Sequence, residues 1–416
     1  MLNIRIIYIC CLILTFASCK MKDEITCYGG SDSDLVQLLE KEGYTLKFYP
    51  SVSEALQNAP EKSGVLLLSD SYPVKGTSIS QEDESLIEAK SLRVLVEFPQ
   101  RIGTTDSSKS DTLNLERIVV CDSINTELPF MSLLSFNRCI LKETSDSINH
   151  PILVAAKVAG FDKAVYGLKD TETRPVLYYR TPHLLVSTTC ISHFASDRYM
   201  PEQKIKSLYE YIFRWLLSKN TVTFSSWITY ITPSYTPSDV LPENAGYESI
   251  KKGIEWFYNG HFLVNSEWKQ NWVDKYMGDG TMPIGPSIPD QFQNGDGSLG
   301  VLEGHMSEIR YDGSQLYRYW MRADVQGEAS YAFAAAGDLL ENNEYSKVAT
   351  NLIDYSFKEY RDSERNDPAS PSYGLLGWAY THKGTYYGDD NARFLLGVIA
   401  SSALLRNYRE FPNDWH

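Results

Sequence analysis

Carboxylate side chains gather in the last third of the sequence, on glycine-rich loops and at the expected starts of helices. Glu303 lies between a leucine and a glycine, and such a setting would desolvate its carboxyl group and raise its pKa. Asp324 and Glu328 stand four residues apart, which places both on one face of a helix. Asp389 and Asp390 precede an apolar run, so one would cap a helix while the other faces a cleft. A protonated and an ionised carboxyl group together can hydrolyse a glycosidic bond.

Other polar and aromatic residues near these carboxylates are candidates for binding a sugar. Sugars stack their C–H faces on aromatic rings, and their hydroxyls need polar partners. Tyr311, Tyr386 and Tyr387 lie on expected loops beside carboxylates, so we expect them to stack on the sugar. In an elimination reaction a histidine or a tyrosine would take the proton, so a lyase is an alternative to a hydrolase. The polar residues expected to bind the substrate are Arg322, Gln326, His305, Asp389 and Arg393.

The stretch from Gly278 to Glu328 carries most of these residues. It begins with a loop rich in Gly, Pro and Asp, and a loop of this length inside a compact domain is functional or disordered. Its apolar side chains favour a folded loop. The runs Gly278–Thr281 and Asn294–Ser298 resemble parts of a calcium-binding loop, but the closing glutamate of an EF-hand is absent. We therefore expect neither a metal site nor a cofactor.

Helical patterns on both sides of this loop must position its residues. Apolar residues recur there with a period of about 3.6, and few strand patterns lie between them. Helices joined in pairs are typical of a helical toroid. The expected helices are Tyr247–Tyr258, Ser266–Tyr276, Ser314–Leu340, Tyr345–Tyr360, Leu375–Tyr380 and Asn391–Tyr408.

Residues 246–416 resemble a partial (α/α)6 toroid of the glycoside hydrolases and related carbohydrate-active proteins. The resemblance rests on the helix pairs, the Gly/Asp-rich loops at helix starts and the run Tyr386–Arg393 before an apolar helix. It implies a central cleft, with retention or inversion at the anomeric carbon left open. A complete toroid needs more residues than follow the linker. We therefore expect either a truncated toroid or a fragment of a longer protein, and we favour the fragment. The residues that the resemblance implies to be catalytic are Glu303, Asp324, Glu328 and Asp390.

Residues 24–220 alternate short apolar runs with helical patterns, which implies a parallel sheet covered by helices. Ser51, with Glu54 three residues later, marks a helix start. The second half is less regular, and the amphipathic helix Pro201–Leu217 closes the domain. The expected strands are Ile25–Tyr28, Thr45–Tyr49, Gly64–Ser69, Leu92–Phe98, Arg117–Cys121, Ile152–Val158, Val165–Leu168, Pro175–Arg180 and Leu184–Cys190.

This order of elements resembles the glutamine-amidotransferase-like flavodoxin fold, an α/β fold with a parallel sheet. In that family a cysteine on a sharp glycine-flanked turn is the nucleophile, yet the strand that ends at Ser69 and Asp70 carries none. Cys190 is followed by His193, but no glycine turn surrounds it, so a structural role is expected. Ser69 and Asp70 would face the crevice where such sheets bind ligands. Docking, scaffolding or a retained binding role is therefore predicted here rather than catalysis.

The first residues predict a lipoprotein signal peptide. Arg5 precedes a short apolar run, and small residues stand directly before Cys19, which resembles a bacterial lipobox. Cys19 would become the lipidated first residue of the mature chain. Lys20–Glu24 resembles the charged signal that directs some Gram-negative lipoproteins to the cell surface. The alternatives are an ordinary signal peptide and, for an outer-membrane lipoprotein, the periplasmic face.

The length of 416 residues is enough for two domains. The composition is that of a folded chain, because 43% of the residues are apolar and 22% are charged. A net charge of −14 without a basic stripe argues against nucleic-acid binding. Cys27, Cys121, Cys139 and Cys190 follow Cys19 without zinc-site spacing, so we expect buried thiols. The predicted segments are 1–18 (signal peptide), 19–23 (lipidated tether), 24–220 (amidotransferase-like domain), 221–245 (linker) and 246–416 (partial toroid).

Together these patterns predict a cell-surface lipoprotein that acts on complex glycans. The lipobox and the amidotransferase-like domain resemble lipoproteins of bacterial polysaccharide-utilisation systems. A glycoside hydrolase is the first hypothesis. A non-catalytic glycan-binding or scaffold lipoprotein and a polysaccharide lyase are the alternatives. The expected partners are an oligo- or polysaccharide substrate and, through Cys19, the membrane.

Overall fold

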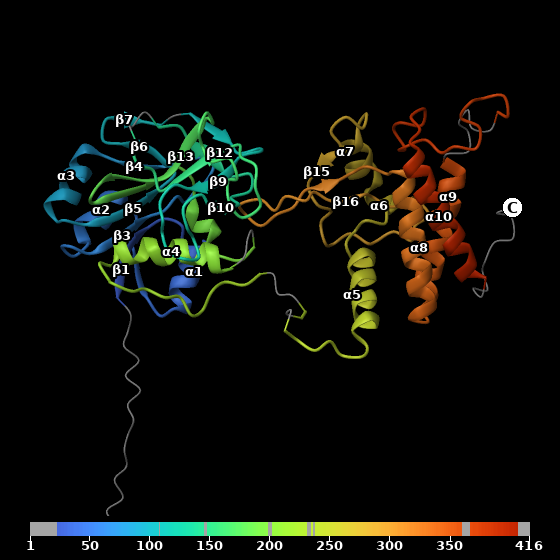
Figure 1. The fold of residues 1–416 in the computed structure, drawn as a ribbon, viewed down its shortest axis with the longest axis horizontal. Coiled ribbons are helices and arrows are strands. Elements are labelled where there is room, and N and C mark those ends of the chain that lie inside the picture. The colour runs from blue at the N-terminus through green and yellow to red at the C-terminus, as the bar shows by residue number, and fades with distance from the viewer. Residues whose placement is uncertain are drawn as a thin grey trace, which may run out of the picture. The chain divides into compact units, whose positions relative to one another are not determined.

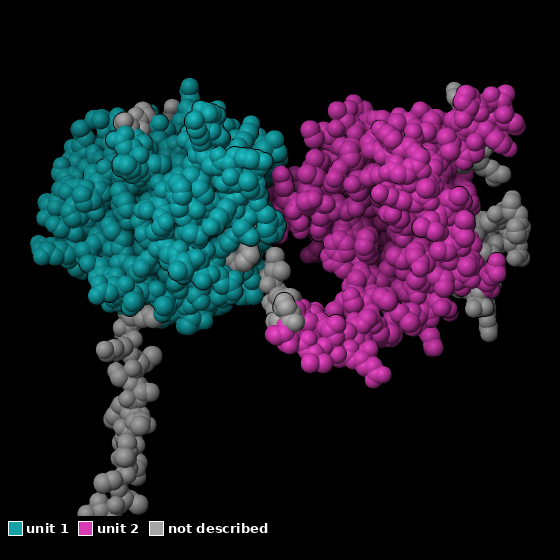
Figure 2. Space-filling model, in the orientation of Figure 1, with its two compact units in different colours: residues 1–232 teal, residues 233–416 magenta. Residues whose placement is uncertain are grey.

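The computed structural model describes residues 23–107, 109–144, 148–198, 202–230, 234–235, 238–359 and 367–406 (Figure 1). The chain divides into two compact units, residues 1–232 and residues 233–416 (Figure 2). The predicted signal peptide and lipidation site Cys19 lie outside the described residues. None of the helices within the described ranges is long and apolar enough to cross a membrane.

Unit 1 is built on a nine-stranded mixed sheet, with the order β10-β9-β12-β13-β14-β5-β3-β1-β2. The strands from β14 to β2 pair in parallel, whereas β10, β9, β12, β13 and β14 pair antiparallel. The prediction of a parallel sheet is therefore confirmed for one half of it. The strands are β1 (Glu24–Tyr28), β2 (Thr45–Phe48), β3 (Gly64–Leu67), β5 (Arg93–Glu97), β9 (Arg117–Val120), β10 (Leu133–Leu134), β12 (Leu153–Ala156), β13 (Thr173–Thr181) and β14 (Leu184–Ser187).

Helices cover the parallel half because its inner strands, such as β3 and β14, are buried on both faces. The Ser51 side chain accepts a hydrogen bond from the Glu54 amide at 3.2 Å, which confirms the predicted helix start. Apolar residues of α2 and α3 pack on one face of the sheet, formed by alternate residues such as Val65 and Val94. The helices are α1 (Asp34–Lys41), α2 (Val52–Asn58), α3 (Gln81–Ala89), the 3-10 turn η1 (Ile191–Phe194) and α4 (Glu202–Leu216).

The smaller strands of unit 1 form two further sheets beside the large one. The predicted strand Val165–Leu168 is wrong, because these residues lie in turns and largely face solvent. The three-stranded sheet consists of β4 (Thr77–Ile79), β6 (Pro99–Ile102) and β7 (Thr105–Asp106), and the two-stranded sheet of β8 (Ser110–Thr112) and β11 (Ile140–Lys142).

Unit 1 extends past the predicted start of the linker at residue 221. Phe224 and Trp227 are buried, and their rings pack on Phe213 and Tyr209 of α4, with centroids 5.5 and 5.9 Å apart. These apolar side chains need a core, and α4 supplies it. The segment that was predicted as an extended linker therefore begins inside the first unit.

Unit 2 is mainly helical and includes a small antiparallel sheet of order β15-β17-β16. The prediction that a helix begins at Ser314 is wrong, because β17 and an extended segment precede α8. The short helix expected at Leu375–Tyr380 is likewise replaced by turns and isolated bridges. The elements are α5 (Ala245–Asn259), α6 (Ser266–Trp268), η2 (Lys269–Asp274), α7 (Lys275–Met277), β15 (Ile284–Gly285), β16 (Gly304–His305), β17 (Tyr317–Arg318), α8 (Ala323–Leu339), α9 (Asn343–Glu359) and α10 (Gly388–Leu405).

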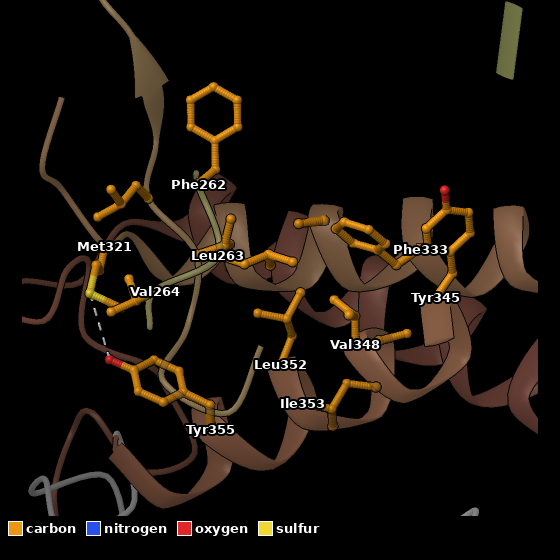
Figure 3. Packing of buried hydrophobic residues seen from close by; sticks show 14 of the residues in the cluster. Phe262, Leu263, Val264, Met321, Phe333, Tyr345, Val348, Leu352, Ile353 and Tyr355 are labelled. Atoms are coloured by element: carbon orange, nitrogen blue, oxygen red, sulfur yellow. Dashed lines mark hydrogen bonds between the residues drawn. The ribbon is translucent and has the colours of Figure 1, made fainter. Parts of the chain in front are cut away.

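The core of unit 2 lies where α8 and α9 meet the segment before α6 (Figure 3). Phe262, Leu263 and Val264 are buried, and the ring of Phe262 points away from the side of α9 that carries Leu352. Met321, two residues before α8, lies beside Val264, and its sulfur accepts a hydrogen bond from the Tyr355 hydroxyl at 3.9 Å. The long loop from residue 278 is therefore folded onto this core, as its apolar residues predicted.

Candidate functional site

Arg322 lies immediately before α8 and binds carboxylates from two helices. Its Nη2 donates hydrogen bonds to Oδ2 of Asp324 at 2.8 Å and to Oδ1 of Asp390 at 2.6 Å. Asp324 lies in the first turn of α8, and Asp390 lies in the first turn of α10. Both aspartates are almost fully buried, with 2% and 4% of their surface exposed. The starts of the two helices thus form one charged cluster.

Packing along α8 and α10 brings these helix starts together. Ser330 of α8 and Ser401 of α10 share a hydrogen bond of 2.8 Å between their hydroxyl oxygens. Arg322 forms an antiparallel bridge with Ala379, and the amide of Ala323 donates to the carbonyl of Trp378 at 3.0 Å. The segment before α10 is therefore fixed to the segment before α8 by backbone hydrogen bonds.

Glu303 approaches the cluster from the small sheet. Its amide donates to the carbonyl of Trp320 at 2.8 Å, which places it directly before β16 and opposite the end of β17. Its Oε1 lies 3.4 Å from Nη1 of Arg318 and 3.8 Å from Nη1 of Arg322. Three carboxyl groups from three separate elements therefore surround one guanidinium group.

Three buried polar atoms of this cluster have no hydrogen-bond partner. They are Glu303 Oε2, Arg322 Nε and Asp324 Oδ1, and they belong to a set of eight such side-chain atoms in the part of the chain that the structure describes. A buried polar atom without a partner costs stability, so such atoms are rare in folded proteins. Their concentration here points to a site that is completed by a ligand.

Burial raises the pKa of Asp324 from 3.8 to about 7. A hydrogen bond with Asp390 and the repulsion of its charge act in the same direction, while the charge of Arg322 opposes them. Asp324 is therefore partly protonated near neutral pH. A carboxyl group that is protonated near neutral pH can act as a general acid.

Aromatic rings border the cluster. The rings of Trp320 and Trp378 lie 5.3 Å apart, and Arg318 lies 4.8 Å above the Trp320 ring. Tyr387 packs edge-on against Trp378 at 5.7 Å and keeps 48% of its surface exposed. An exposed aromatic ring beside carboxylates is the arrangement that binds a sugar ring.

The sequence pattern predicted a helix at Trp320 and indicated no binding role for Trp378. The residues Tyr317, Tyr319 and Met321 are buried, while the residues between them (Arg318, Trp320 and Arg322) contribute to the cluster. This alternation has the period of a strand rather than of a helix. It is the signal that could have identified Arg318 and Trp320.

Several predicted site residues lie elsewhere. Glu328 and Asp389 are exposed, so Glu328 does not join the buried cluster although it lies four residues after Asp324 in α8. Gln326 is buried and binds the backbone of Val301, accepting from its amide at 2.9 Å and donating to its carbonyl at 2.8 Å. Its role is therefore to position the loop before Glu303.

The remaining predicted residues differ in their surroundings. Arg393 is close to the cluster, with its Nη1 3.7 Å from Oδ2 of Asp324. His305 lies against the rings of Trp256, Phe262 and Tyr317, and burial lowers its pKa. The half-buried residues are Tyr311, on the loop between β16 and β17, and Tyr386, beside Tyr387.

Cys190 and His193 of unit 1 do not form a nucleophilic pair. Cys190 is buried, and its thiol donates to the carboxylate of Glu97 at 3.2 Å. Burial and the charge of Glu97 raise the pKa of Cys190 well above its usual value, which keeps the sulfur protonated. Glu97 also accepts from the Ser69 amide at 3.0 Å, while Asp70 accepts from the Gly30 amide at 2.8 Å. These contacts support the structural role predicted for Cys190.

Models of known protein families do not match this chain, and neither curated proteins nor solved structures match it. The part of the chain that the structure describes also contains no group of three His, Cys, Asp or Glu residues that could hold a metal ion. The chemistry of the site must therefore be inferred from its own residues.

Proposed function

We propose that unit 2 carries a glycoside hydrolase site centred on Arg322. The observation that supports this most directly is the set of unpartnered buried atoms on Glu303, Arg322 and Asp324. Asp324 adds a carboxyl group with a pKa of about 7, as an acid catalyst requires. Hydrolysis of an O-glycosidic bond needs this acid together with a second, ionised carboxylate.

In this proposal each group has a separate role. Asp324 donates its proton to the oxygen of the leaving sugar. Glu303, which faces the two cationic side chains of Arg318 and Arg322, acts as the nucleophile or as the base for water. The ring of Tyr387 stacks on a sugar next to the cleaved bond.

A substitution series tests this proposal. We expect Asp324→Asn and Glu303→Gln to lower the rate of hydrolysis by at least about 100-fold, the contribution typical of general acid–base catalysis. Oligosaccharide binding should change little, because both substitutions keep the size of the side chain. Glu328→Gln is the matched control, since Glu328 is an exposed carboxylate on the same helix. Release of reducing ends from a panel of polysaccharides is the readout.

A non-catalytic glycan-binding protein is the second candidate. It is favoured by the direct hydrogen bonds of Arg322 to both aspartates, because such bonds also stabilise a site that only binds. Wild-type protein that binds glycans without releasing reducing ends would support this candidate and reject the hydrolase. An unsaturated product that absorbs in the near ultraviolet would instead identify a lyase.

We also propose the finer fold assignments and the location of the protein. The parallel order β2-β1-β3-β5-β14 supports a flavodoxin-type, amidotransferase-like fold for unit 1. The packing of α8 against α9 and α10 supports a partial (α/α)6 toroid for unit 2. The residues before Cys19 support an outer-membrane lipoprotein exposed at the cell surface. Loss of membrane association in Cys19→Ala, together with protease accessibility on whole cells, tests this location.

A further inference from the structure

Two arginines at the edge of the site have side-chain donors that the protein does not use. Arg393 lies one turn after Asp390 in α10, and 53% of its side chain is exposed. Its ion pair with Asp324 is 3.7 Å long, too long for a hydrogen bond. Arg318 stacks on Trp320 and lies 3.4 Å from Glu303, with 33% of its side chain exposed. Within the described residues neither guanidinium group makes a hydrogen bond.

The arginines of the site equal its carboxyl groups in number. Arg318, Arg322 and Arg393 face the carboxyl groups of Glu303, Asp324 and Asp390. The nearby acids Asp389 and Glu328 are exposed, so water and salt screen their charges. This even number of arginines and acids contrasts with the net charge of −14 of the whole chain.

We infer that the glycan bound at this site carries an acidic substituent, a carboxylate or a sulfate, and that Arg393 binds it. A guanidinium group presents parallel N–H donors that match the oxygens of either anion. Arg393 is the better placed of these two arginines, because Arg318 is already stacked on Trp320 and paired with Glu303 at 3.4 Å. This inference rests on the proposed glycan site, but it does not depend on whether the bound glycan is cleaved.

Binding measurements on the intact chain test the inference. Three oligosaccharides that share one backbone, with a uronate, with a sulfate ester or with neither, are titrated by calorimetry at low and high salt. We expect one acidic ligand to bind at least about tenfold more tightly than the neutral one, since a hydrogen bond to a charged group contributes that much. The ligand that gains this affinity distinguishes a uronate from a sulfate.

Substitutions then assign the preference to a residue. Arg393→Ala should remove most of the preference without weakening the neutral ligand, and Arg393→Lys should restore part of it because the charge returns without the planar fork. Arg406→Ala is the matched control, since Arg406 is an exposed arginine at the end of the same helix. Equal binding of all three ligands, absence of binding by both acidic ligands, or equal loss for acidic and neutral ligands in Arg393→Ala would each overturn the inference.

Hydrolysis assays on the same ligands keep the two proposals separate. If the acidic ligand binds through Arg393 and is not cleaved, the hydrolase proposal fails while the inference stands. If neutral and acidic ligands are cleaved and bound equally well, the inference fails while the hydrolase proposal stands.

Discussion

Gly397 of α10 lies directly against the backbone of Gly327 in α8. A Cβ atom at Gly397 would lie 2.3 Å from the Gly327 carbonyl oxygen, and one at Gly327 would lie 2.7 Å from the Cα atom of Phe394. Neither position can hold a side chain without moving a helix. This close approach sets the distance between the two helix starts and hence the hydrogen bond between Arg322 and Asp390.

Gly397→Ala should therefore separate α8 from α10. We expect a loss of about 1–3 kcal/mol in the free energy of unfolding, as for other overpacked interiors, because the clash is with backbone that cannot rotate away. Urea denaturation measures it. Gly253→Ala is the control, since Gly253 lies inside α5 with open space around it, and alanine should stabilise that helix slightly. Equal effects of the two substitutions would contradict the proposed role of the glycine contact.

Removal of the central guanidinium should be more damaging than removal of a surface charge. Arg322→Ala leaves Asp324 and Asp390 buried without their cation, and unpairing a buried charge costs about 3–5 kcal/mol. Lys347→Ala breaks only the exposed pair with Asp296, so less than about 1 kcal/mol should be lost. Chemical denaturation of both variants gives the comparison. A small loss in Arg322→Ala would show that water already compensates the aspartates.

The stability of the protein should depend on pH through Asp324. The folded pKa of about 7 is above the ordinary value of 3.8, so the folded state binds the proton more tightly than the unfolded state. The resulting stabilisation is fully present below about pH 4 and is lost as the pH rises through about 7. Asp324→Asn cannot titrate, so the difference in unfolding free energy between wild type and variant should shrink with rising pH. Urea denaturation at pH 5, 6, 7 and 8 tests this, and parallel pH profiles would contradict it.

Local patterns in the sequence were sufficient for much of the fold. The apolar runs of unit 1 predicted β1, β3 and β5, because buried parallel strands are continuously apolar. Three of the four residues predicted to be catalytic, Glu303, Asp324 and Asp390, lie around Arg322. The strands depend on the immediate neighbours of each residue, which a sequence displays directly.

Other features depend on contacts between distant segments. Residues 317–322 were predicted as helix because aromatic and long side chains occur in both structures, and pairing with β15 and β16 makes them extended. Asp324 and Glu328 have the spacing of one helix face, yet their exposure differs. Asp324 is covered by Arg322 and Asp390, which lie only at the helix start. No spacing rule within α8 contains that information.

Gln326 connects the helix to the loop that carries Glu303, and its substitution should separate positioning from binding. Gln326→Ala leaves the amide and the carbonyl of Val301 buried without side-chain partners, so we expect a loss of about 1–3 kcal/mol in unfolding free energy. Glu303 follows two residues later and would lose its fixed place beside Arg322. If the site is hydrolytic, kcat should fall while KM changes little, because Tyr387, the ring proposed to stack on the sugar, lies on a different element.

Gln326→Glu keeps the acceptor for the Val301 amide and loses the donor, so it should lie between wild type and alanine in both measurements. Unchanged kcat in a destabilised Gln326→Ala protein would show that Gln326 supports the fold alone.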